Sequence, residues 1–283
     1  MLRWLTGRGA AAHRIASTRA QIDPRLWDDL ISHYAFLRAL DATQRQALLA
    51  RTAWILASKT VSATAGLRMT DRIALAIAAQ AALPILNLDP AHYEGWSEII
   101  VYPAGFRIPR TREDEDGVVH EYLEDAAGEA WDGGPVVLSW EDAADDADDF
   151  NVVIHEFAHK LDLCNGEADG VPPLSHCTPA TRKNWVRVLN ESFDTFCRQV
   201  ELVESQIPPD MDPESEESWT WWSTLPMDPY AATDEAEFFA VSSELFFVNP
   251  TLLADRIPRW YDVLADFYQQ DPASSQSHPQ IPA

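Results

Sequence analysis

The sequence predicts an α+β fold that is mainly helical, with a small β-sheet beside one histidine-bearing helix. Apolar residues recur at three- and four-residue steps over residues 24–57 and 181–203, which is the spacing of amphipathic helices. Two shorter runs, at 99–102 and 134–140, are rich in β-branched residues and have the composition of strands. The second of these runs comes shortly before the stretch that carries two histidines.

The elements can be assigned in order along the 283 residues. Residues 1–22 contain arginines and no acid, and are predicted to be a flexible basic tail, whereas 23–270 are predicted to form a single domain. Thr70 is expected to cap a helix that ends at Pro84. The charged segment 110–117 should be a solvated loop or a hairpin, and the Pro-, Ser- and Gln-rich residues 271–283 a disordered tail.

His155, Glu156 and His159 form an H-E-x-x-H motif within the apolar run Asn151 to Asp162. In a helix, positions four apart lie on the same face about one turn apart, so two imidazole nitrogens can converge on one metal ion. Glu156 would then lie beside a water on the metal, a position that suits a general base. The alternative is a metal-free pair of core histidines.

Catalytic zinc usually takes three protein ligands and keeps a fourth position for water, so a second segment must contribute. Thr233 or Asp234 is expected to begin a helix in which Glu237 is surrounded by apolar residues, and a carboxylate buried there needs a partner. Glu237 is therefore the candidate ligand. Its alternative role is the third residue of a capping box with Asp234. Glu244, two turns later on nearly the same face, could support the site or replace Glu237.

The strand at 134–140 has two interpretations. Pro135 cannot donate a ladder hydrogen bond, which is compatible with an edge strand that could hold an extended peptide through main-chain hydrogen bonds. The run also fits an ordinary core strand. The two interpretations make different predictions about where a substrate would lie.

Charge and composition restrict the class of protein. With 21 basic and 45 acidic residues the formal net charge is -24, which argues against a nucleic-acid partner. The longest apolar window, 73–86, is shorter than the ~20 residues that a membrane span needs. Cys164, Cys177 and Cys197 have no paired spacing, so a reducing, cytoplasmic setting is expected. His176 beside Cys177 is too isolated to predict a second metal site.

The HEFAH helix, taken together with Tyr230-x-x-x-x-x-x-Glu237-Phe-Phe-Ala, resembles the Mlc titration factor A (MtfA) family of bacterial zinc metallopeptidases. It is more distantly similar to the catalytic domain of anthrax lethal factor. The likeness to the first family covers roughly Trp27 to Phe267. It implies a zincin-like, gluzincin-type fold with one zinc ion per chain, and it implies these roles: His155, His159 and Glu237 as ligands, Glu156 as base, and Tyr230 as the group that stabilises the oxyanion.

The implied function is a zinc-dependent peptidase in which Glu156 activates a zinc-bound water to hydrolyse a peptide or protein substrate. The family is described as having aminopeptidase activity, and its namesake binds the repressor Mlc, so the resemblance also implies a link to a transcriptional repressor. Substrate preference and cleavage mode are left open. The alternative is a regulatory protein that sequesters a transcription factor, its zinc closed by a fourth ligand such as Cys164.

One position departs from lethal factor, which has a second glutamate four residues after its ligand glutamate. This chain has Val241 there. The hydrogen bond that orients a ligating histidine is therefore expected from Glu244 or Asp162.

Overall fold

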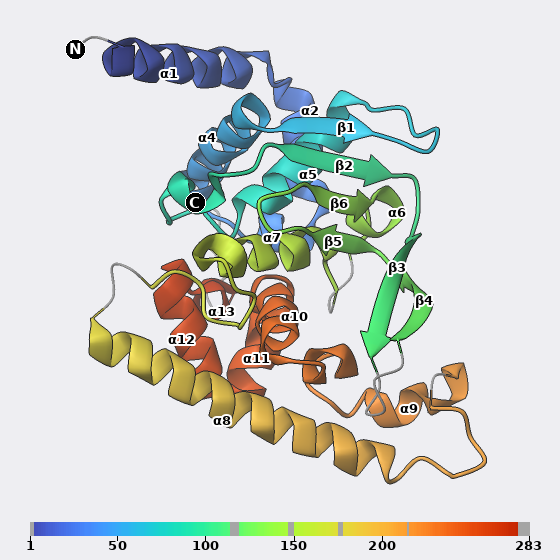
Figure 1. Cartoon of the computed structure of the whole chain (residues 1–283). Helices are drawn as coiled ribbons and strands as arrows, with labels where there is room; N and C mark the ends of the chain where they lie inside the picture. The colour runs from blue at the N-terminus through green and yellow to red at the C-terminus, as the bar shows by residue number, and fades with distance from the viewer. Residues whose placement is uncertain (1–2, 114–118, 147–149, 175–177, 214, 277–283) are drawn as a thin grey trace.

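The computed structural model describes residues 3–113, 119–146, 150–174, 178–213 and 215–276, and is a mainly helical α+β protein with a small sheet (Figure 1). Its α-helices are α1 Arg3–Gln21, α2 Pro24–His33, α3 Ala35–Arg38, α4 Ala42–Ser58, α5 Asp71–Ala82, α6 Trp140–Ala143, α7 Val152–Asp162, α8 Pro179–Glu204, α9 Trp219–Trp222, α10 Glu235–Val248, α11 Pro250–Arg256, α12 Pro258–Tyr268 and α13 Pro272–Gln276. Short 3-10 turns are η1 Pro90–Tyr93, η2 Leu163–Asn165, η3 Glu216–Ser218 and η4 Pro229–Ala232.

Four strands form a mixed sheet in the order β1-β2-β6-β5: β1 Thr60–Ala63, β2 Glu98–Tyr102, β5 Gly128–Ala130 and β6 Val136–Ser139. The first three in this order are parallel, and β5 runs antiparallel to β6 with Gly128 opposite Leu138. β6 is buried along its whole length between two neighbours. The edge interpretation of the run at 134–140 is therefore wrong, because the three-residue strand β5 occupies that edge.

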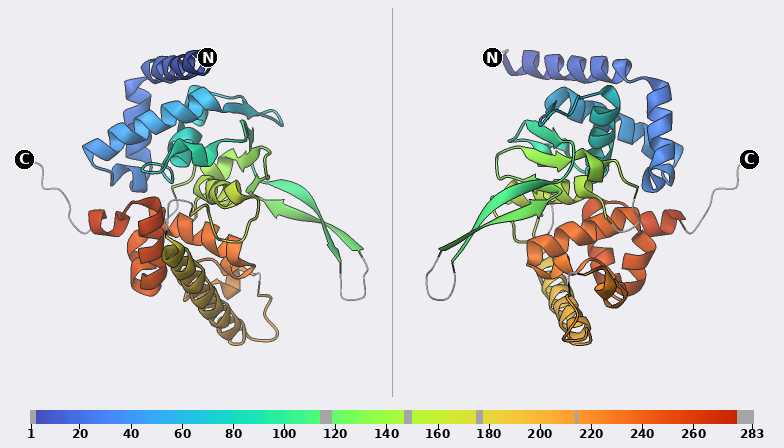
Figure 2. Two further views of the ribbon diagram at one scale, coloured as in Figure 1. Left: turned by 60° about the vertical axis from the view of Figure 1, so that its left-hand side comes forward. Right: turned by 90° about the vertical axis from the view of Figure 1, so that its right-hand side faces the viewer.

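The charged segment around residue 110 belongs to a hairpin, one of the two predicted alternatives. Strands β3 Phe106–Glu113 and β4 Val119–Ala126 pair antiparallel, from Phe106 opposite Ala126 to Glu113 opposite Val119. Figure 2 shows this hairpin projecting from the body of the molecule. The tip, residues 114–118, lies outside the described residues.

Helix α7 lies between the sheet and α10, in contact with β5 and β6 on one side and with α10 on the other (Figure 1). It begins at the N-cap Asn151, whose side chain accepts a hydrogen bond from the backbone of Ile154. Its apolar face, Ile154, Phe157, Ala158 and Leu161, is fully buried. Each large side chain buried in this way contributes roughly 1.5–3 kcal/mol, so packing rather than helix propensity fixes α7 in place.

Helix α10 is apolar on nearly every side and correspondingly buried. Asp234 caps its first turn by accepting from the backbone N–H of Glu237 at 2.9 Å, as the predicted helix start requires. Phe238 and Phe239 have no exposed surface and pack in an aromatic cluster with Trp185 and Trp260. The helix backbone is therefore held firmly, with Glu244 buried and Glu237 partly exposed.

Both segments predicted to be flexible contain a helix. α1 packs against α4, with Ala11 and Ile15 partly buried, because the acid-free segment still carries apolar residues at helical spacing. α13 follows Asp271, whose carboxylate accepts hydrogen bonds from Ser274 and from the hydroxyl of Tyr261. Residues 277–283, the rest of the predicted disordered tail, lie outside the described residues.

Buried apolar side chains form a cluster that runs from Trp27 to Tyr268 and so joins α2 to α12. Cys164 and Cys197 are free thiols. Among the described helices, none combines the length and the apolarity that crossing a membrane requires.

Candidate metal centre

Helices α7 and α10 bring three predicted ligand atoms together. Nε2 of His155 lies 3.1 Å from Nε2 of His159, and Oε2 of Glu237 lies 3.2 Å from the first nitrogen and 3.3 Å from the second. The three side chains are the group of described His, Cys, Asp and Glu residues whose atoms could share one metal ion. Residues far apart in the chain thus converge at one point, as the sequence predicted.

The spacing of these atoms suits a small cation. Ligands that bind zinc at about 2.0–2.2 Å with tetrahedral geometry lie about 3.3 Å from one another. Oε2 of Glu237 is buried and, despite its short distances to both imidazoles, makes no hydrogen bond of acceptable geometry within the described part of the chain. A buried carboxylate oxygen without a hydrogen bond is expected to have a cationic partner. The residues present therefore fit a metal ion.

The capping role of Glu237 and its position in the cluster are compatible. Its backbone N–H is bonded to Asp234, but its side chain faces the two imidazoles instead of returning to the helix start. Burial alone would raise the pKa of Glu237, but the two imidazoles of His155 and His159, each within 3.3 Å of its Oε2, outweigh burial and hold the pKa well below its usual range. The carboxylate is ionised at neutral pH, which metal binding requires.

Glu244 orients the first histidine. Its Oε1 lies 2.7 Å from Nδ1 of His155, and its Oε2 accepts the backbone N–H of Asn151 at 2.5 Å. Asn151 in turn donates from its side chain to Gln80 at 2.7 Å. Burial opposes a charge on His155, yet the carboxylates of Glu237 and Glu244 raise its pKa well above the ordinary value. Of the two residues expected to orient a histidine, Glu244 does so.

Asp162, the other residue expected to orient a histidine, makes its hydrogen bond elsewhere. Its Oδ2 accepts the backbone N–H of Gly170 at 2.7 Å, while its Oδ1 is buried without a hydrogen-bond partner in the described chain. Burial raises the pKa of Asp162 to about 7. The residue joins the end of α7 to the loop that follows.

Glu156 is 4% exposed and lies among the cluster charges. Its Oε2 has no hydrogen-bond partner in the described residues, and burial raises its pKa to about 7 against the lowering effect of His155 and His159. A carboxyl group with a pKa near neutrality can both take and return a proton at physiological pH. Glu156 is therefore a buried carboxyl group, influenced by the charges of the two histidines, that can change protonation state near neutral pH.

Gly128 is a site residue that the sequence reasoning missed. A Cβ added there would lie 2.4 Å from Oε1 of Glu156 and 2.8 Å from its Cδ. The main chain of β5 therefore passes directly against the carboxylate, and only glycine leaves room for it. The available signal was a glycine in a short run before the 134–140 strand, too weak to identify without the sheet.

Tyr230 lies in η4, which packs against α10, and its backbone N–H donates to Asp228 at 2.8 Å. Its side chain is 46% exposed, and its ring centroid is 6.3 Å from that of His155. The phenol is thus near the cluster and open to solvent.

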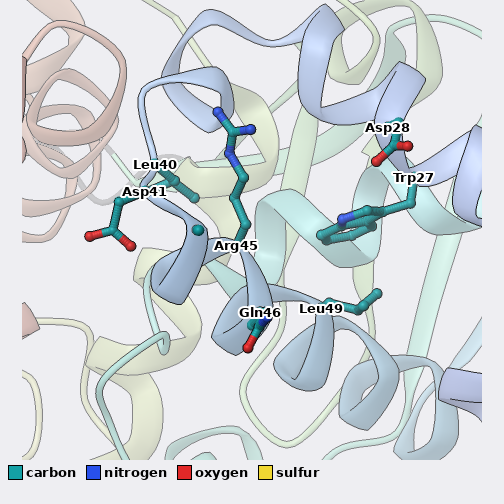
Figure 3. Close-up of a pocket in the computed structure, with 8 residues that line it drawn as sticks. Trp27, Asp28, Leu40, Asp41, Arg45, Gln46 and Leu49 are labelled. Carbon is teal, nitrogen blue, oxygen red and sulfur yellow. The ribbon is translucent and has the colours of Figure 1, made fainter. Parts of the chain in front are cut away.

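Cys164, the suggested fourth ligand, is not part of the cluster, because its Sγ donates to the carbonyl oxygens of His92 and Lys160. His176 and Cys177 lie outside the described residues. A separate surface cavity of about 450 Å³ lies between α2 and α4, and Trp27, Arg45 and Leu49 are among the residues that line it (Figure 3). It contains none of the candidate site residues.

A helical α+β fold with an H-E-x-x-H helix and a convergent glutamate defines a candidate metallopeptidase centre, and comparison with known proteins identifies the family. The family model described as glucose-regulated metallo-peptidase M90 matches residues 8–269. Mlc titration factor A of Serratia proteamaculans is 36% identical over 249 residues, 87% of each chain. The Salmonella gallinarum protein of that name is 35% identical over 252 residues, 87% of this chain and 86% of its own. The Klebsiella pneumoniae protein is 36% identical over 241 residues, 83% of each. The chain belongs to the Mlc titration factor A (MtfA) family of metallopeptidases.

Proposed function

We propose that this protein is a zinc-dependent peptidase with one zinc ion per chain, held by His155, His159 and Glu237. The observation that carries the proposal is the mutual spacing of 3.1–3.3 Å among the three ligand atoms. Two imidazoles and one carboxylate are a ligand set found in catalytic zinc sites, which keep an open position. Among the described residues, the cluster contains no fourth protein ligand.

When bound, zinc supplies a Lewis acid that polarises the scissile carbonyl and lowers the pKa of water toward ~7. Glu156 takes the proton from the attacking water at its buried carboxylate and then delivers it to the leaving amine. Its pKa of about 7 suits both steps. Glu244 keeps His155 in the tautomer that presents Nε2 to the metal.

Tyr230 is assigned to the oxyanion. Its phenol is exposed on the α10 side of the cluster, where a substrate carbonyl can reach it. A hydrogen-bond donor at a developing oxyanion is typically worth about 3 kcal/mol of transition-state stabilisation.

The substrate is a peptide or protein segment that adds to the edge of β5. In the described chain the strand ladder of β5 is with β6 alone, which makes β5 the edge strand of this sheet beside the cluster. Gly128 brings this edge into contact with Glu156. A peptide bound there passes the general base whatever its side chains are. We expect this reaction to take place in the cytoplasm, in keeping with the free thiols of Cys164 and Cys197.

Zinc stoichiometry and peptide hydrolysis test the proposal in the full chain. Wild type should hold one zinc ion, and His155→Ala and Glu237→Ala should lose it, while His13→Ala and Glu235→Ala serve as matched controls at exposed or half-buried positions. Glu156→Gln should keep zinc and lose at least ~100-fold in hydrolysis. Zinc retained by Glu237→Ala, or hydrolysis retained by Glu156→Gln, would contradict the assignment.

The cleavage mode is decided by a pair of peptides that differ only at the N-terminus. An aminopeptidase needs the free amine and should not cleave the acetylated peptide, whereas an endopeptidase cleaves both. The two outcomes distinguish the modes without changing the protein.

A regulatory binding function is the second candidate, favoured by the name that the relatives share, which refers to titration of Mlc. In this alternative the protein acts by binding and sequestering a transcriptional repressor, and it does not cleave the repressor. Co-elution of the chain with a purified Mlc-type repressor, unchanged by Glu156→Gln and without cleavage of either peptide, would favour it over the peptidase.

A further inference from the structure

Gly170 connects three helices that surround the metal centre. Its N–H donates to Oδ2 of Asp162 at the end of α7, at 2.7 Å, and its carbonyl accepts from Nε1 of Trp185 on α8 at 2.9 Å. Its third contact is with the first residue of α10, because an added Cβ would lie 2.5 Å from the carbonyl oxygen of Glu235. The residue itself is buried, with φ of +72°.

The two hydrogen bonds use the backbone of residue 170, whereas its φ and its contact with Glu235 require that the residue be glycine. The φ of +72° belongs to the left-handed region that side chains disfavour. The 2.5 Å contact is with main chain, and main chain cannot rotate away as a flexible side chain can. A methyl group at this position must therefore displace either the loop or the first turn of α10.

The first turn of α10 is also the part that positions Glu237. Asp234 bonds the backbone N–H of Glu237, so Glu235 and Glu237 move as one capped turn. Three residues before Asp162, His159 lies on the last turn of α7. Besides the direct packing of α7 on α10, the loop contact at Gly170 therefore links the turn that carries His159 to the turn that carries Glu237.

We propose that Gly170 is a positioning residue of the metal centre, which fixes α10 against α7 at the distance that lets Glu237 share a cation with the two histidines. This inference rests on the proposed zinc site. It assigns metal affinity to a loop residue that touches no ligand side chain. Residues that support metal ligands from behind typically change metal affinity by 10–100-fold when altered.

Gly170→Ala and Gly166→Ala form a matched pair, because Gly166 also has a positive φ, of +94°, but an added Cβ there meets nothing within 4 Å. Zinc affinity is measured on the full chain by competition with a chromophoric chelator, and coordination geometry by the visible spectrum of the Co²⁺ form. We expect Gly166→Ala to behave as wild type and Gly170→Ala to bind zinc roughly 10–100-fold more weakly with an altered Co²⁺ spectrum.

A second pair covers the case in which Gly170→Ala does not fold. Trp185→Phe removes the buried hydrogen bond to the Gly170 carbonyl and keeps an aromatic ring. Trp222→Phe removes a bond of the same length, 2.9 Å, to the Pro213 carbonyl at an exposed position. We expect weaker zinc binding and a changed Co²⁺ spectrum in the first variant alone.

Two results are decisive. Wild-type affinity and spectrum in Gly170→Ala, or in Trp185→Phe if the glycine variant is unfolded, would overturn the inference while the zinc site stands. If the wild type bound neither Zn²⁺ nor Co²⁺, the proposed function itself would be wrong and this inference with it.

Discussion

Oε1 of Glu244 lies 2.7 Å from Nδ1 of His155, so α10 holds that imidazole from behind with one glutamate while Glu237 faces its other nitrogen. The same Glu244 carboxylate accepts the N–H of Asn151, the N-cap of α7. The Glu244 side chain thus holds both the imidazole ring of His155 and the first residue of the helix that carries it.

Replacing Glu244 by glutamine should weaken zinc binding roughly 10–100-fold, because the amide has one acceptor oxygen where the carboxylate has two, and its NH2 group would face the imidazole N–H. The helix should remain, since the amide oxygen can still accept from Asn151. Chelator competition measures the affinity, with Glu235→Gln on the same helix as control. An unchanged affinity would show that the contact does not support the metal.

Gly128→Ala should abolish hydrolysis without releasing zinc, because the new methyl group takes the place of the Glu156 carboxylate. Moving a general base typically costs 10²–10⁴-fold in rate. Gly105→Ala is the matched control, since a Cβ there meets only the carbonyl of Ala126 at an ordinary 3.5 Å. Turnover and bound zinc are measured on the same preparations, and an active Gly128→Ala enzyme would rule out the close approach of β5.

The metal-free protein should become less stable as pH rises from about 4.5 to about 7, because burial raises the pKa of Glu156 from 4.5 to about 7 and the folded state holds its proton longer. Glu156→Gln removes this titration. Its unfolding free energy should exceed that of wild type above pH 7 by on the order of 3 kcal/mol at most, and the difference should shrink toward pH 4.5.

Urea unfolding of the two chelator-treated proteins at several pH values measures this difference, with Glu98→Gln as a control at an exposed carboxylate. A gap between wild type and Glu156→Gln that stays constant with pH would contradict the perturbed pKa.

Tyr230→Phe should lower kcat about 10²-fold and leave zinc content unchanged, because the proposed role of the phenol is to donate a hydrogen bond to the oxyanion of the transition state. Tyr102→Phe, on β2, removes a hydroxyl from a ring that stacks on Phe106 at 4.9 Å, and serves as control. Steady-state kinetics distinguish the two variants. A change confined to KM would assign Tyr230 to substrate binding instead.

The residues with strong local signals were predictable from sequence. Thr70 and Asp234 are caps in the structure, and the apolar runs around the histidine motif and after Asp234 located α7 and α10. Glu237 could be singled out because an acid within so apolar a run needs a partner.

Other features depend on contacts that sequence does not encode locally. Strand β5 has three residues and no apolar run, so it exists only by pairing with β6. Gly128 and Gly170 matter because of what lies opposite them in space, and α1 is stabilised by packing against α4. The pattern of apolar residues in a sequence can indicate which residues are buried in the core, but it does not indicate which part of the chain lies opposite them.

The wide separation of the histidines from Glu237 along the chain has a consequence during synthesis. A ribosome exposes His155 and His159 well before it has added Glu237 and Glu244, and domains acquire structure as their segments emerge. An unfinished polypeptide therefore lacks the carboxylates that complete the centre. The proposed metal centre can therefore form only after most of the chain has been made.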